Sequence, residues 1–113
     1  MILYRALRPD VEPQVVAIDE DEYEVVREEG EPLGVDGVFL IDSFDVPGAD
    51  EEPFLADWDT ARAPLASRRG YLGARLYRAD TRFVGVIRWS SPLMVHRAHD
   101  LVPPGRALYQ ASG

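Results

Sequence analysis

The 113-residue sequence contains no cysteine, no lysine and no asparagine. The lack of cysteine excludes disulfides, thiol nucleophiles and cysteine-ligated metal or iron–sulfur sites. The lack of lysine excludes Schiff-base chemistry, a covalently held pyridoxal phosphate and the lysine of a phosphate-binding loop. No apolar run is long enough for a membrane span or a signal peptide, so no membrane partner and a cytoplasmic location are expected.

The chain is acidic, with a formal net charge of -8 and an isoelectric point near 4.6. Its surface repels phosphate backbones and anionic membranes, so nucleic-acid binding is not expected and the ligand should be a small molecule. A length of 113 residues with 46% hydrophobic content suffices for one compact domain with one core.

Three segments alternate apolar and polar residues, as strands do. They are expected at 35–46 (VDGVFLIDSFDV), 71–78 and 82–90, with a tight turn at 79–81 joining the last two and a final strand at 107–111. One face of the first strand carries Val38, Leu40, Asp42, Phe44 and Val46. In the second strand Tyr71, Gly73, Arg75 and Tyr77 are expected to share a face, as are Phe83, Gly85, Ile87 and Trp89 in the third.

Two helices are expected between these strands. Asp50 can cap the first one. Its apolar stripe has helical spacing, formed by Phe54, Trp58, Ala61 and Leu65, and Arg68 to Gly70 form a suitable C-terminal end. Pro64 should bend it. The second helix should be capped by Ser91, present Met94, Ala98 and Leu101 as its apolar side, and end at 103–105.

The order strand, helix, strand, strand, helix, strand predicts an α+β ferredoxin-like domain at 35–113, a βαββαβ antiparallel sheet with both helices on one face. The other face then requires a cover, which predicts a homodimer. Residues 1–34 are expected to form an N-terminal extension or arm. In one interpretation it holds a strand at 1–8 and then a hairpin of 15–18 with 23–26 around the acidic turn 19–22. In the other it is a mostly extended arm whose acidic run is solvated.

The stretch FLADWDTARAPLASRRGYLGARLYRADTRFVGVIRWSS resembles the antibiotic biosynthesis monooxygenase family over about residues 37–110. The similarity rests on Trp58, Gly70, the LGARLYR strand at 72–78, the WSS at 89–91 and Ala98. It implies a dimeric α+β barrel with a pocket between sheet and helices in each protomer. It also implies an oxidation of anthrone-like polyketides to quinones by molecular oxygen, with no flavin, haem or metal cofactor.

The resemblance also suggests which residues line the pocket. Family members place a tryptophan at the end of the third strand, matched by Trp89, and an asparagine four residues earlier, where this chain has Gly85. They often have an asparagine on the first strand, where this chain has Asp42. A related haem-degrading branch ligates iron through a histidine on the second helix, a position that His99 approximates.

Asp42 is the candidate base, because a carboxylate among apolar residues on a buried strand face suits proton abstraction from a phenol or an α-carbon. The alternative is a salt-bridged acid paired with Arg75 or Arg88. Trp89 is either a stacking wall for a flat substrate or simply core. Further candidate substrate contacts are Phe44, Trp58, Tyr71, Arg75, Tyr77 and Arg88, with packing at a dimer interface as the alternative for the tyrosines.

His96 and His99 lie three residues apart, and either can act as a proton shuttle at the pocket mouth. Two histidines with nearby Asp100 but no further matching ligand are more typical of surface residues than of a metal site, so no metal is expected.

The resemblance implies a cofactor-independent monooxygenase of a polycyclic aromatic polyketide, in antibiotic or pigment biosynthesis, and the residues of this chain offer Asp42 or a histidine as its base. The alternatives are a non-redox polyketide cyclase of the same fold and a noncatalytic binding subunit.

Overall fold

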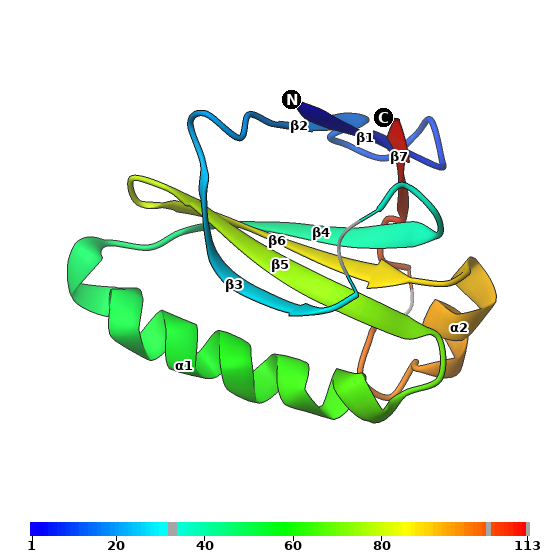
Figure 1. Cartoon of the computed structure of the whole chain (residues 1–113). Coiled ribbons are helices and arrows are strands. Elements are labelled where there is room, and N and C mark those ends of the chain that lie inside the picture. Colours follow the sequence, from blue (N-terminus) through cyan, green and yellow to red (C-terminus); the bar gives the residue numbers. More distant parts are fainter. Residues whose placement is uncertain (32–33, 104, 113) are drawn as a thin grey trace.

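The computed structural model describes residues 1–31, 34–103 and 105–112, which form an antiparallel seven-stranded sheet and two α-helices (Figure 1). The strands are β1 (Ile2–Ala6), β2 (Val15–Ile18), β3 (Glu24–Gly30), β4 (Val38–Asp45), β5 (Tyr71–Ala79), β6 (Arg82–Trp89) and β7 (Tyr109–Ser112), in the spatial order β2-β1-β7-β4-β6-β5-β3. The helices are α1 (Glu51–Arg62) and α2 (Pro92–Arg97), with 3-10 turns η1 (Gly48–Asp50) and η2 (Ala63–Ser67).

The predicted ferredoxin-like core is confirmed. The chain runs β4, α1, β5, β6, α2, β7, and the central strands lie in the order β7-β4-β6-β5. Residues from α1, η2 and α2 pack in clusters with one face of β4, β5 and β6 (Figure 1). The expected inward face of the first strand is also confirmed, since Val38, Leu40, Phe44 and Val46 all belong to these helix-side clusters.

The first helix ends earlier than its apolar stripe predicts. It stops at Arg62, and Pro64 lies in η2, because proline cannot donate the backbone hydrogen bond that a continuing α-helix requires. Trp58 and Leu65 are nonetheless both buried, one on α1 and one on η2. Asp50 occupies the N-cap position as expected, but its side chain does not make a capping hydrogen bond.

The second helix is capped as expected, with the Ser91 side chain accepting a hydrogen bond from the Met94 amide at 3.4 Å. Its buried residue is Val95, and Ala98 at the C-cap position is buried too, whereas Leu101, expected on the apolar side, is exposed. Pro104, expected to help end this segment, lies outside the described residues.

The N-terminal segment belongs to the sheet. β1 pairs with β7 on one side and β2 on the other, while β3 pairs with β5 at the opposite edge. The predicted hairpin of 15–18 with 23–26 is therefore wrong, because the acidic turn after Ile18 leads the chain from one edge of the sheet to the other. The two termini lie beside each other, with Leu3 opposite Ser112 (Figure 1).

The sheet face opposite the helices is covered in large part by this segment. Within the described part of the chain β4 and β7 share a single pair, Phe39–Tyr109, and Figure 1 shows β1 and β2 above β4–β6, with β7 running down between the two groups. Tyr4 and Ile18 are 1% and 0% exposed in a cluster with Phe39, Tyr77, Val84, Val86 and Tyr109. The chain itself thus supplies much of the cover for which the sequence suggested a second protomer.

A β-bulge corrects one face assignment. The register between β5 and β6 shifts between Tyr71 and Gly73, so that Tyr71 lies opposite Trp89 on the helix side. Tyr71 contacts Trp89 edge-to-face, with ring centroids 5.8 Å apart. It therefore does not share a face with Tyr77, which packs in the opposite cluster.

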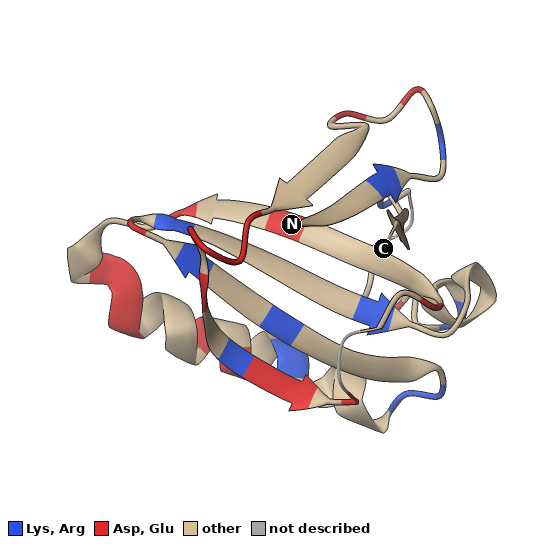
Figure 2. Ribbon diagram, turned by 45° about the horizontal axis from the view of Figure 1, so that its top comes forward, with Lys and Arg blue, Asp and Glu red and all other residues tan. Residues whose placement is uncertain are grey.

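Ion pairs join the edge strand β3 to its neighbours. Arg78 on β5 contacts both Glu24 and Glu51, and Arg75 contacts Glu28. Figure 2 shows the resulting alternation of arginine and acidic segments on this side of the sheet. Among the described residues, neither helix has the length and apolar character required to cross a membrane.

Candidate functional site

A partly open cavity of about 220 Å³ lies on the helix side of the sheet. Its walls come from β4, β6, α1, η2 and the segment after α2, and most of its lining is apolar: Leu40, Phe44, Trp58, Ala61, Leu65, Ile87, Leu101 and Val102, with the charged residues Asp42, Arg62 and Arg106. A concave, mostly apolar space with a few convergent charges is the usual form of a small-molecule site.

Asp42 and Arg106 form an ion pair within this lining. Nη2 of Arg106 donates to Oδ1 of Asp42 at 2.7 Å. The side chain of Asp42 is 40% exposed and that of Arg106 is 33% exposed, so both reach solvent from the cavity wall. The pair presents a carboxylate and a guanidinium side by side to a bound molecule, which can take a proton at one group and stabilise developing negative charge at the other.

Asp42 on β4 is the direct cross-strand partner of Gly85 on β6. The two positions at which the family resemblance places asparagine are therefore neighbours here. The space above Gly85 is filled by Trp58 of α1, because a Cβ built on Gly85 would lie 2.5 Å from Cζ3 of that indole. The buried Nε1 of Trp58 has no hydrogen-bond partner among the described residues, although buried donors usually have one.

Arg62 is fixed at the side of the cavity by β3 and β5. It forms an ion pair with Glu29, which also accepts a hydrogen bond from the Tyr71 hydroxyl. Burial raises the pKa of Tyr71, and the Glu29 carboxylate raises it further. Burial lowers the pKa of Arg62, but its contacts with Glu29 and Tyr71 outweigh this, and the pKa is raised overall.

The structure brings three of the predicted site residues together: Asp42, Phe44 and Trp58 all line the cavity. Trp89 is 0% exposed in the helix-side core and is not part of this lining. Tyr77 belongs to the opposite-face cluster, and its hydroxyl accepts a hydrogen bond from Nη1 of Arg75 at 3.1 Å. Arg88 donates from Nε to the Asp36 carbonyl at 2.7 Å.

The two histidines line a different cavity, of about 170 Å³, between α2 and the segment leading into β7. Their ring centroids are 6.3 Å apart and both side chains are exposed. Arg106 and Val102 border this cavity as well as the one at Asp42, so the two spaces adjoin. Within residues 1–31, 34–103 and 105–112, no group of three or more histidine, cysteine, aspartate or glutamate side chains is arranged to hold a metal ion.

Sequence reasoning missed Arg106 and Arg62. The salt-bridge alternative for Asp42 named Arg75 or Arg88, but the partner is Arg106, 64 positions along the chain. The single sequence signal for Arg106 was its position in the loop that follows the second helix. That loop reaches β4 only in the folded chain.

The sequence matches no protein-family model and no curated protein. Solved structures do match the fold. A ferredoxin-fold protein of Listeria monocytogenes related to antibiotic biosynthesis monooxygenases superposes with a TM-score of 0.59 at 16% identity, covering 80% of this chain and 64% of that one. The chain has the fold of monooxygenase-related ferredoxin-like proteins. With 64% of the first Listeria monocytogenes protein covered, the chain spans less than two thirds of that protein's length.

Two further solved structures have a similar fold. A heme-degrading enzyme of Listeria monocytogenes has a TM-score of 0.58 at 17% identity, covering 78% of this chain and 69% of that one. A monooxygenase-like protein of Listeria innocua has a TM-score of 0.58 at 15% identity, covering 88% and 72%. At these identities the likeness concerns the fold.

The residues of the Asp42 cavity do not fit a histidine-ligated haem. No histidine lines it, and its one carboxylate is paired with Arg106. His96 and His99 lie in the adjoining cavity, where Arg106 and Val102 separate them from Asp42. An axial ligand of the usual imidazole or thiolate kind is therefore missing from this site.

Proposed function

We propose that the chain is a cofactor-independent monooxygenase that oxidises a phenolic or enolisable aromatic compound in the cavity at Asp42. The single observation that carries the proposal is the Asp42–Arg106 pair in an otherwise largely apolar cavity. The fold it shares with monooxygenase-related proteins supports the reaction class.

The ion pair supplies what such a reaction requires from the protein. The Asp42 carboxylate accepts the acidic proton of the substrate, and the Arg106 guanidinium stabilises the resulting enolate oxygen. The apolar walls formed by Leu40, Leu65 and Ile87 hold the ring and limit access of water to the anion.

Oxygen then reacts with the bound anion. The anion gives one electron to O2, and the radical and superoxide combine at carbon to form a peroxide that takes the proton back from Asp42. Asp42 removes the second hydrogen of that carbon as a proton, the O–O bond breaks, and hydroxide leaves as water with this proton. For a CH2 carbon the sum is CH2 + O2 → C=O + H2O, with the carbon oxidised and oxygen reduced.

The cavity volume limits the substrate. A closed protein cavity of about 150 Å³ accommodates benzene, so 220 Å³ suits one or two fused rings. A larger polyketide, such as the resemblance implies, has to extend past Ala61 and the exposed Leu101 at the rim. A polycyclic polyketide substrate and a role in antibiotic or pigment biosynthesis are the more specific forms of this proposal.

The test is oxygen uptake and quinone formation with 1-naphthol and with anthrone, in the presence of a metal chelator. Asp42→Asn should lower kcat/KM by at least 100-fold, the usual range for loss of a general base. Asp45→Asn is the matched control, because Asp45 lies on the same strand but is exposed and outside the cavity lining, and it should change kcat/KM by less than twofold.

Saturable binding of these compounds without oxygen uptake would reject the oxygenase and favour the cyclase or binding alternatives. Ring closure of a poly-β-ketone without uptake would single out the cyclase. Equal activity of Asp42→Asn and wild type would remove Asp42 from the mechanism.

A further inference from the structure

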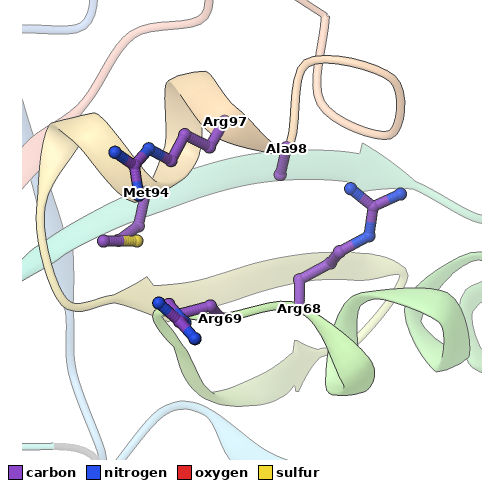
Figure 3. A pocket seen from close by; sticks show the side chains of 5 residues that line it. All are labelled: Arg68, Arg69, Met94, Arg97 and Ala98. Atoms are coloured by element: carbon purple, nitrogen blue, oxygen red, sulfur yellow. The ribbon is translucent and has the colours of Figure 1, made fainter.

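A third cavity, of about 260 Å³, lies between α2 and the segment that enters β5. Arg68 and Arg69 line it from that segment, and Met94, Arg97 and Ala98 line it from α2 and its C-terminal end (Figure 3). None of the five lines the Asp42 cavity.

Gly70 determines how closely the two walls approach. Its φ is +90°, a conformation that glycine adopts readily, and an added Cβ would collide with Cβ and Cγ of Met94. Its carbonyl accepts a hydrogen bond from the Ser90 amide at 2.8 Å, which ties this segment to the end of β6 just before α2. The cavity walls are therefore held by backbone contacts rather than by flexible side chains alone.

Arginine dominates the charged lining. Arg68 is bound by Asp100 through both terminal nitrogens, one of them at 2.9 Å, and this contact fixes it. Arg69 and Arg97 have no ion pair or side-chain hydrogen bond to any described residue. In a chain with 20 acidic residues, six other arginines do find carboxylates: Arg8, Arg27, Arg62, Arg75, Arg78 and Arg106.

Figure 3 shows how the two unpaired arginines lie. In this view the guanidinium groups of Arg69 and Arg97 lie toward the same end of the cavity, on either side of the Met94 side chain, and that of Arg68 lies toward the other end. A guanidinium binds a carboxylate or phosphate through two parallel hydrogen bonds, and it does so better where an apolar wall excludes water.

We propose that this cavity binds a small organic anion. Its carboxylate or phosphate contacts Arg69 and Arg97, and its apolar part lies on Met94 and Ala98. The site is independent of the oxygenase proposal, since the two cavities share no residue.

The experiment is a titration of the full chain at constant ionic strength, followed by amide NMR shifts, with phenyl phosphate, benzoate, inorganic phosphate and neutral benzyl alcohol as probes. Saturable shifts are expected at 68–70 and 94–98 with phenyl phosphate or benzoate, and the tighter of the two identifies the head group. Arg69→Ala and Arg97→Ala should each weaken binding at least fivefold, with partial recovery in Arg69→Lys.

Arg82→Ala is the matched control, because Arg82 is also exposed and also lacks a side-chain partner in the described part of the chain, and binding should change less than 1.5-fold. Equal weakening in all alanine variants would overturn the proposal in favour of nonspecific attraction. Absence of saturable binding of both organic anions in the folded wild type would also overturn it, as would equal affinity for benzyl alcohol or for inorganic phosphate. Asp42→Asn should leave the binding unchanged whether or not the oxygenase proposal holds.

Discussion

Gly85 on β6 lies directly beneath the indole of Trp58 on α1, so close that a Cβ at position 85 would be 2.5 Å from Cζ3 of the ring. Gly85 is also the cross-strand partner of Asp42. The missing side chain at position 85 therefore makes room for Trp58, and the tryptophan in turn forms one wall of the cavity that Asp42 and Arg106 border.

Gly85→Ala should destabilise the protein by about 1–3 kcal/mol, the usual cost of overpacking a core. The added methyl must displace the Trp58 ring, so tryptophan fluorescence should change together with the urea midpoint. Gly48→Ala is the control, because a Cβ there meets nothing within 4 Å, and its midpoint should stay within error or rise. An unchanged midpoint for Gly85→Ala would contradict the close contact.

Ile18→Ala should lower the free energy of unfolding by about 2–5 kcal/mol, because Ile18 is 0% exposed between the N-terminal strands and the outer face of the sheet. Val15→Ala on the same strand should cost about 0.5 kcal/mol or less, since Val15 is 44% exposed. Chemical denaturation of both variants measures the difference. Similar small losses would mean that residues 1–18 do not belong to the cooperative core.

Glu29→Ala should cost about 1–3 kcal/mol, because it leaves the part-buried Arg62 and the Tyr71 hydroxyl without their common partner. Glu28→Ala is the comparison. Glu28 is 51% exposed and pairs with Arg75 at the sheet edge, so its removal should cost about 1 kcal/mol or less. The prediction fails if the two variants unfold at the same urea concentration.

Stability should fall as the pH rises above about 10, where tyrosines of the unfolded chain ionise. Burial raises the pKa of Tyr4, Tyr71 and Tyr109 in the folded protein, so these phenols keep their protons longer in the folded than in the unfolded state. The folded state then binds more protons, and the free energy of unfolding decreases with pH in this range. Urea unfolding from pH 8 to 11 measures the decline, which Tyr4→Phe should make shallower.

Local patterns of the sequence were enough for the ferredoxin-like core. Period-two alternation gave β4, β5 and β6 with their inward faces, since each strand buries one side on the same helices. Helical spacing located Trp58 and Leu65 on the buried side. The boundary errors are local too: Pro64 ended α1 at Arg62, and the bulge after Tyr71 moved that ring to the helix side.

Long-range pairing decided the rest. Alternation does not say which strand is a neighbour, so the positions of β2 and β3 at opposite edges, and the cover that β1, β2 and β7 give to the second face, appear only in the folded chain. The same holds for the sites. Asp42 was recognisable from its apolar surroundings in the sequence. Its partner Arg106, the Trp58 ring over Gly85 and the meeting of Arg69 with Arg97 depend on contacts between distant segments, and local sequence patterns do not show which distant segments meet.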